Sequence, residues 1–233
     1  MLISGVERFT LLDYPGKTAA ILFTAGCTFR CGFCHNPEFV LPDLLATMKD
    51  SFIPEEAVLN FLQTRQGLLD GVVISGGEPT VQPDLLSFIA KIKAMGFLVK
   101  LDTNGNRPEI VEQALADGLL NYIAMDVKTS LKHYPELAGS LVKPDAVKKS
   151  IDVIRTSGIP YEFRSTLIKE VHSKEILEDM RTLLSGSEQL FLQTFRPGHT
   201  LLPAFQDFHP FSIDEMQDLA AFFGKNIRHV AFR

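Results

Sequence analysis

Short apolar segments alternate with amphipathic segments about six times along this chain of 233 residues. The apolar segments are typical of buried strands, and the amphipathic segments carry helix start and stop signals. Such alternation favours parallel strands joined by right-handed helical crossovers. We therefore predict one α/β domain over residues 1–233, with an N-terminal leader over 1–18, a core over 19–200, and a C-terminal helix and short strand over 201–233.

Individual residues mark where several of the expected elements begin and end. Pro144 and Gly158 bound one helix, and the spacing of Ser212 and Glu215 is that of a capping box. Residues 36–50 are expected to be irregular. The predicted strands cover 18–24, 71–75, 97–101, 122–125, 161–167, 189–195 and 228–232. The predicted helices cover 54–66, 83–95, 108–117, 144–157, 174–185 and 212–223.

The unusual polar residues of the chain come where predicted strands end. In parallel α/β barrels the chemistry gathers at the carboxyl ends of the strands, because the connecting loops meet there. This pattern predicts a functional site built from several strand ends. Its members are the three cysteines, Glu78, Asp102, Asp126, Arg164 and Gln193.

All three cysteines of the chain, Cys27, Cys31 and Cys34, occur within eight residues in a C-x3-C-x2-C spacing. This spacing can bring three thiolates around one inorganic centre. Structural zinc and ordinary electron-transfer clusters take four protein ligands, so three cysteines leave one metal position open. Unrelated buried thiols and a zinc site completed by His35 are the alternatives, whereas an odd number of cysteines argues against a disulfide framework.

Composition narrows the classes of function. With 45% hydrophobic residues the chain can bury a large core, and its net charge of −5 argues against a nucleic-acid partner held by charge. No apolar run approaches the roughly 20 residues that span a bilayer, and the first residues lack the features of a signal peptide. Clustered, reduced cysteines suit a reducing compartment, so we expect a cytoplasmic protein with no membrane partner.

The cysteine spacing, with the aromatic Phe33 before the last cysteine, resembles the radical S-adenosylmethionine (radical SAM) superfamily. The resemblance implies that Cys27, Cys31 and Cys34 hold one [4Fe–4S] cluster. Its open iron would bind the amino and carboxylate groups of S-adenosylmethionine, with Phe33 near the cofactor. It also implies an incomplete (β/α)6 barrel of parallel strands in a single domain.

The Gly-Gly-Glu-Pro segment after the second predicted strand resembles the second signature of that superfamily. Gly76 and Gly77 would let the backbone approach a ligand closely. The resemblance implies that Glu78 receives the cationic amino group of S-adenosylmethionine. By itself the same segment is also an ordinary turn.

Two further strand ends resemble those of the activating enzymes of glycyl radical enzymes, a radical SAM subgroup. These are the segments that begin at Asp102 and at Asp126. The resemblance places Asp102, Thr103 and Asp126 by the methionyl end of the cofactor and implies that they hold a monovalent cation. Lys128 would pair with the cofactor carboxylate or with a neighbouring aspartate.

Arg164 lies in a strand that is otherwise apolar enough to be buried, and a buried arginine must be paired. Its partner is a core carboxylate or the carboxylate or ribose of the cofactor, and we favour the cofactor. Gln193, together with Phe195 and His199, is placed on the adenine side, although His199 also fits an ordinary loop histidine. The remaining histidines, His133, His172, His209 and His229, are expected to be structural or on the surface.

The chain as a whole resembles the activating proteins of anaerobic ribonucleoside-triphosphate reductases. This implies reductive cleavage of S-adenosylmethionine to a 5′-deoxyadenosyl radical, and formation of a glycyl radical on a partner enzyme. A reductant such as flavodoxin or ferredoxin would supply the electron. The chain has Asp13-Tyr14-Pro15-Gly16 where many activators have Asp-Gly-Pro-Gly. A radical SAM enzyme for a small molecule, similar to 7-carboxy-7-deazaguanine synthase, and a non-catalytic iron–sulfur protein remain alternatives.

Overall fold

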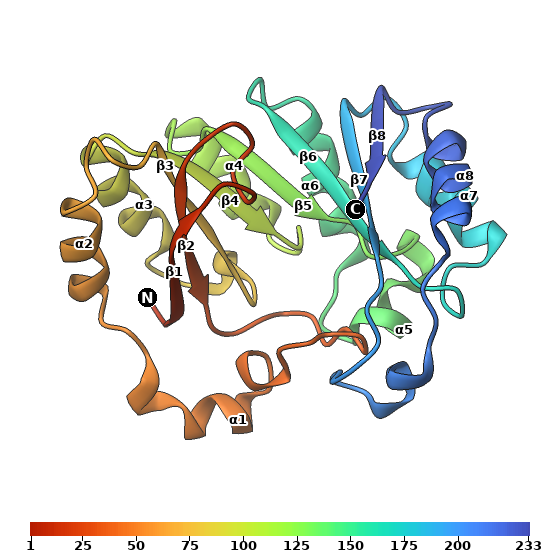
Figure 1. Ribbon diagram of the computed structural model, residues 1–233, viewed down its shortest axis with the longest axis horizontal. Helices are drawn as coiled ribbons and strands as arrows, with labels where there is room; N and C mark the ends of the chain where they lie inside the picture. The colour runs from red at the N-terminus through yellow and green to blue at the C-terminus, as the bar shows by residue number, and fades with distance from the viewer. The chain divides into compact units, whose positions relative to one another are not determined.

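The computed structural model describes residues 1–233, apart from the side chain of Lys49, and has α/β architecture with mostly parallel strands (Figure 1). The chain forms two compact units. The first comprises Met1–Thr28, Glu38–Thr103 and Glu109–Ile123, and the second comprises Phe29–Pro37, Asn104–Pro108 and Ala124–Arg233. The predicted α/β class is confirmed, whereas the division into leader, core and C-terminal part stays a prediction.

The first unit contains the first four strands, and most of its elements agree with the sequence pattern. Its strands are β1 Ile3–Thr10, β2 Ala19–Thr24, β3 Gly71–Gly76 and β4 Leu98–Thr103. Its helices are α1 Pro42–Thr47, α2 Glu55–Gln63 and α3 Leu85–Ala94, with 3-10 turns at Lys49–Ser51 and Pro79–Val81. Helix α4, Pro108–Ala116, and strand β5, Tyr122–Asp126, each have residues in both units.

The register of the parallel strands brings their carboxyl ends together in the first unit. Strand β2 pairs with β3 from Ala19 opposite Gly71 to Thr24 opposite Gly76. Strand β3 in turn pairs with β4, from Gly71 opposite Leu98. The loop after β2, which carries Cys27, therefore starts beside the Gly-Gly-Glu-Pro turn that follows β3.

Two elements of the first unit differ from the sequence prediction. Strand β1 lies within the predicted leader and pairs antiparallel with β2, so the strands are not all parallel. Three of its eight residues are exposed, which weakens the alternation that marks a strand. Helix α1 lies in the segment 36–50 that was predicted to be irregular. It spans six residues and buries none of them, so it has no apolar face to reveal it.

Tyr14 anchors an apolar cluster of the first unit, which also contains Ala19, Ile21, Val73 and Tyr122. The Tyr14 and Tyr122 rings lie 5.9 Å apart, and burial raises the pKa of Tyr14 to about 12. A Cβ on Gly71 would lie 3.0 Å from the Tyr14 ring, so residue 71 must stay small. The Asp13–Gly16 segment thus has a tyrosine because that side chain fills the core beneath the strands.

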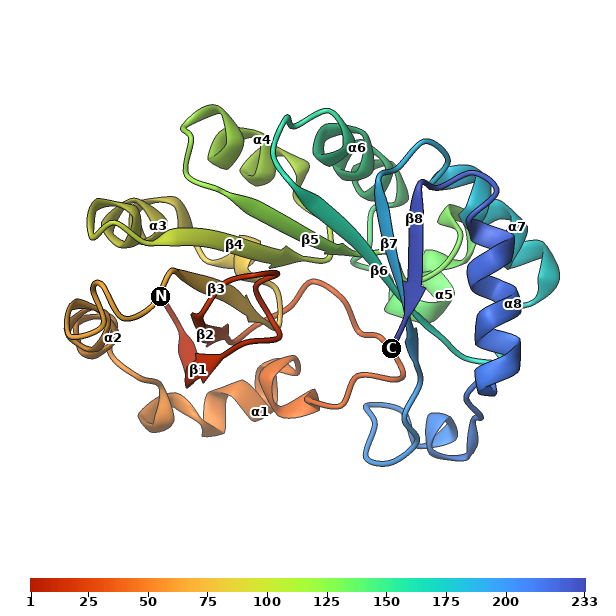
Figure 2. The same ribbon diagram turned by 45° about the horizontal axis from the view of Figure 1, so that its top comes forward.

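The second unit contains the later strands and the helices that cover them (Figure 2). Besides most of β5, its strands are β6 Tyr161–Leu167, β7 Gln189–Thr194 and β8 His229–Phe232. Its helices are α5 Tyr134–Ala138, α6 Pro144–Arg155, α7 Lys174–Leu183 and α8 Ile213–Phe223. Short 3-10 turns lie at Leu131–His133 and Pro203–Asp207, and another, Pro37–Phe39, begins in this unit and ends in the first.

Strands β6, β7 and β8 are parallel, as predicted, and α8 packs against β7 and β8 (Figure 1). Helix α8 begins with the predicted capping box. The Ser212 hydroxyl accepts from the Glu215 backbone N–H at 3.3 Å, and the Glu215 carboxylate accepts from the Ser212 N–H at 2.6 Å. Helix α5 and the turn before it were not predicted. Among the residues described here, no helix is both long and apolar enough to cross a membrane.

Replacing Ser212 by Ala should lower the free energy of unfolding by about 1 kcal/mol, because the first turn of α8 loses its cap. Urea unfolding of the metal-free, reduced protein would measure the change. Ser87→Ala is a matched control, because exposed Ser87 bonds only to the Asp84 carbonyl and caps no helix end. Equal losses in the two variants would contradict a specific contribution from the capping box.

Candidate functional site

In the first unit the turn after β3 packs directly on the residues that precede Cys27. The Gly77 N–H donates to the Thr24 carbonyl at 2.8 Å. A Cβ on Gly76 would lie 2.4 Å from the Thr24 backbone nitrogen and oxygen, and a Cβ on Gly77 would lie 2.2 Å from the Gly26 carbonyl oxygen. Both glycines are therefore required for the turn to lie against the start of the cysteine loop.

Glu78 is fully buried in this turn, with 0% of its surface exposed. Its Oε1 atom accepts hydrogen bonds from the Thr80 N–H at 3.1 Å, from the Thr80 hydroxyl at 2.6 Å and from the Thr103 hydroxyl at 2.8 Å. The structure therefore brings together two predicted site residues, Glu78 and Thr103. Thr80 was not singled out by the sequence, because a threonine after Glu-Pro is also ordinary in a turn.

Asp102 lies next to the last residue of β4, beside the ammonium group of Lys100 from the same strand. Lys100 Nζ lies 2.5 Å from Asp102 Oδ1, and the Ser75 hydroxyl donates to Asp102 Oδ2 at 3.0 Å. An ammonium group thus already stands at this carboxylate, and the binding of a monovalent cation by Asp102, Thr103 and Asp126 stays a prediction. The sequence did not identify Lys100, since a lysine that alternates with apolar residues usually faces solvent.

In the second unit the cysteine loop is fixed by backbone hydrogen bonds to unpredicted segments. The Arg30 N–H donates to the Ala138 carbonyl at 2.7 Å, at the carboxyl end of α5. The Leu201 N–H donates to the Cys34 carbonyl at 2.9 Å. Helix α5 is short and buried, so its sequence has too few residues for a helical period to be visible.

Thiols are the donors that iron–sulfur clusters take, and the ligand role of Cys27, Cys31 and Cys34 stays a prediction. Cys31 is 8% exposed, and Cys27 and Cys34 are partly buried. Burial raises the pKa of the Cys31 thiol to about 11, and nearby Lys128 only partly offsets it. Ligation of iron by Cys31 would therefore displace its proton, as it does wherever thiolates ligate metal.

Asp126, Lys128 and Arg164 form one ionic network at the end of β5 and in the middle of β6, so Arg164 does not lie at a strand end as predicted. Arg164 Nε donates to Asp126 Oδ1 at 2.8 Å, and Lys128 Nζ lies 3.1 Å from Asp126 Oδ2. Burial would raise the pKa of Asp126, but the two cations outweigh it and hold this pKa well below its usual range. Arg164 thus has a core carboxylate as a partner, which was the alternative to the cofactor. Its contact with the cofactor stays a prediction.

The backbone of Lys128 is bonded on both sides. Its N–H donates to the Tyr134 hydroxyl at 3.0 Å, and its carbonyl lies 3.0 Å from His172 Nε2. The other ring nitrogen of His172 accepts from the Ile168 N–H at 2.9 Å, so Nε2 carries the proton in the neutral ring. Lys128 Nζ lies 5.8 Å from the centre of the Phe33 ring, which is 7% exposed. His172 and Tyr134 thus fix a predicted site residue, although neither was predicted to do so.

The remaining predicted residues lie near the end of β7. Gln193 is partly buried, and the Thr166 hydroxyl lies 3.4 Å from its Oε1 atom. Phe195 is 1% exposed and stacks on His35, with the ring centres 6.4 Å apart. His35 Nδ1 lies 2.8 Å from the His199 carbonyl oxygen, whereas the His199 side chain is exposed. Their placement on the adenine side of the cofactor stays a prediction.

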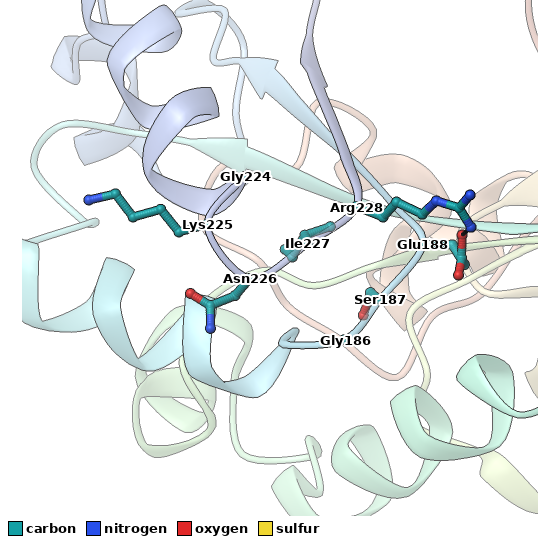
Figure 3. A pocket seen from close by; sticks show the side chains of 8 residues that line it. All are labelled: Gly186, Ser187, Glu188, Gly224, Lys225, Asn226, Ile227 and Arg228. Atoms are coloured by element: carbon teal, nitrogen blue, oxygen red, sulfur yellow. Dashed lines mark hydrogen bonds and ion pairs between the residues drawn. The ribbon is translucent and has the colours of Figure 1, made fainter.

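A pocket of about 350 Å³ lies at the opposite ends of the strands of the second unit (Figure 3). It is lined by residues 186–188 before β7 and 224–228 before β8. Arg228 turns toward Glu188 and pairs with it at 2.9 Å, while Lys225 points away (Figure 3). In parallel α/β barrels this amino-end face serves stability, so the pocket is not a candidate active site.

The model of the radical SAM superfamily matches residues 21–183, and the chain therefore belongs to this superfamily of enzymes. Its members carry a [4Fe–4S] cluster and bind S-adenosylmethionine. A Methanocaldococcus jannaschii protein, named as a candidate glycyl-radical enzyme activating enzyme, is 31% identical over 100% of this chain and 95% of its own length. A Listeria monocytogenes pyruvate formate-lyase-activating enzyme is 32% identical over 54% of this chain and 52% of its own length, so the match spans about half of that enzyme.

Solved structures show the same fold at low sequence identity. Streptococcus suis SuiB superposes with a TM-score of 0.64 and 17% identity, over 91% of this chain and 48% of SuiB. Escherichia coli QueE superposes with a TM-score of 0.58 and 17% identity, over 99% of this chain and 92% of QueE. The chain thus spans about half the length of SuiB and nearly all of QueE. These matches agree with the partial (β/α)6 barrel that the sequence predicted.

Lowering the pH should destabilise the wild-type protein more steeply than the His172→Gln variant. Burial lowers the pKa of His172, so the unfolded chain, with a pKa of about 6.5, binds a proton first as the pH falls. The neutral His172 ring therefore stabilises the folded protein above about pH 6.5, and this stabilisation is lost as the pH falls below that value. Urea unfolding of both proteins between about pH 7.5 and about pH 5.5 would test this, because the gap between them should shrink. A constant gap would contradict it.

Proposed function

We propose that this chain is an activase that generates a glycyl radical on a partner enzyme. The observation that carries this proposal is the match along the whole chain to the M. jannaschii protein, at 31% identity. The partial match to a pyruvate formate-lyase-activating enzyme points to the same class of reaction. The radical SAM framework supplies the means, because the superfamily is defined by its cofactor chemistry.

When bound, the reduced cluster and S-adenosylmethionine supply methionine and a 5′-deoxyadenosyl radical, which takes a hydrogen atom from the Cα of a glycine. The protein binds and orients these groups. In this proposal Cys27, Cys31 and Cys34 ligate the cluster through their thiolates. The buried carboxylate of Glu78 attracts the amino group of the cofactor, and its hydrogen bonds to Thr80 and Thr103 keep it in one orientation.

The ionic network of the second unit is suited to an anionic part of the cofactor. Lys128 and Arg164 together carry two positive charges, against one negative charge on Asp126. The three side chains are partly exposed, at 17%, 14% and 26%. In this proposal Lys128 and Arg164 attract the cofactor carboxylate, as cations do in partly buried sites.

We further propose that the partner is an anaerobic ribonucleotide reductase and that the electron comes from a flavodoxin or ferredoxin. The resemblance of the N-terminal third, from Gly5 to Glu38, to reductase activators supports this choice. In this proposal the glycine loop of the partner completes the site.

Anaerobic reconstitution with iron and sulfide, followed by reduction and addition of S-adenosylmethionine, should yield 5′-deoxyadenosine. With the correct partner present, electron paramagnetic resonance should show a glycyl doublet on that partner. Chromatography of the nucleoside and spectra of the same samples provide the measurement. Separate incubations with an anaerobic ribonucleotide reductase and with pyruvate formate-lyase would distinguish the partners.

The Cys31→Ala variant is the matched control, and it should lack both the cluster and the nucleoside product. Nucleoside formation by the wild type without a protein radical on either partner would reject the activase. That result would favour a small-molecule substrate, as in the 7-carboxy-7-deazaguanine synthases. A fully loaded Cys31→Ala variant would reject the ligand assignment.

A further inference from the structure

Lys100 is a buried cation at the centre of the first unit. Lys100 is 1% exposed, and it lies in β4 between Val99 and Leu101, which are fully buried. A charged lysine in such surroundings is stable only when a counter-charge compensates its loss of water. Its Nζ atom lies 2.5 Å from Asp102 Oδ1 and 5.9 Å from the centre of the Tyr122 ring.

The strand itself creates this pair. Residues two apart in a strand point to the same side of the sheet, so Lys100 and Asp102 share one face of β4. Lys100 lies deeper, and Asp102 lies at the carboxyl end of the strand, where 12% of its side chain is exposed. The ammonium group therefore approaches the carboxylate from the protein interior.

Both oxygen atoms of Asp102 accept hydrogen bonds from nearby side chains. Oδ1 accepts from the Lys100 ammonium group, and Oδ2 accepts from the Ser75 hydroxyl at 3.0 Å. The hydroxyl of the neighbouring Thr103 donates to Glu78 Oε1 at 2.8 Å. An alkali ion at Asp102 would have to share the carboxylate with a fixed positive charge only one hydrogen bond away, and the two cations would repel each other.

We propose that the Lys100 ammonium group supplies, at the end of β4, the positive charge that a bound alkali ion would otherwise supply. Binding of S-adenosylmethionine to this protein is then independent of K⁺ and Na⁺. Lys100 acts as a positioning residue, because its hydrogen bond holds the Asp102 carboxylate in one orientation. This inference rests on the proposed place of Asp102 beside the cofactor, and it is independent of which protein is the partner.

The test compares wild type, Lys100→Met and Lys100→Arg after cluster reconstitution. Equilibrium dialysis measures S-adenosylmethionine affinity in KCl, NaCl and choline chloride at one ionic strength. Wild type and Lys100→Arg should bind equally well in the three salts. Lys100→Met removes the charge but keeps the length of the side chain, so its affinity should be weaker by roughly tenfold or more in choline chloride. KCl or NaCl should restore much of that loss.

A second readout needs neither cluster nor cofactor. KCl should raise the thermal unfolding midpoint of metal-free Lys100→Met relative to choline chloride, and leave that of the wild type unchanged. Wild-type affinity that falls tenfold without alkali ions would overturn the proposal, as would Lys100→Met binding that is strong in choline chloride. Failure of the wild type to bind S-adenosylmethionine in any salt would reject the proposed function, whereas the unfolding midpoints would still decide the role of Lys100.

Discussion

The ionic network of Asp126, Lys128 and Arg164 joins the end of β5 to β6 in the second unit. The backbone of Lys128 also bonds to the Tyr134 hydroxyl and the His172 ring, which fix the position of this residue. The Lys128 ammonium group also lies over the ring of Phe33, which comes between Cys31 and Cys34 in the sequence. The cysteine loop of this unit thus lies against a charge that burial alone would not favour.

In the first unit, buried carboxylates also need partners, and these carboxylates are Glu78 after β3 and Asp102 near the end of β4. Glu78 is held by hydroxyl and backbone donors, whereas Asp102 is held by an ammonium group and a hydroxyl. The two carboxylates thus differ in the chemistry of the donors shown for them, because an ammonium group offsets the negative charge of Asp102.

Much of the framework could be predicted because it depends on local pattern. The strands near residues 19–24 and 71–76 are continuous apolar runs, and the capping box before α8 is a short-range signature. Strand β1 and helices α1 and α5 were missed, because they are too short or too weakly periodic for sequence alone. Their hydrogen bonds come from distant segments, as at Ala138, which accepts from the cysteine loop.

The sequence by itself predicted the thiol donors of the site and the alternation of strands and helices, because three cysteines in eight residues and polar strand ends follow from spacing alone. The tertiary structure decided which charges neutralise one another. Lys100 looks like a surface lysine in an alternating strand, yet the packing of Tyr122 and its neighbours removes it from water. His172 likewise has no motif around it, and only the fold brings its ring to the Lys128 carbonyl. Burial depends on contacts between segments far apart in the chain, which local spacing does not encode.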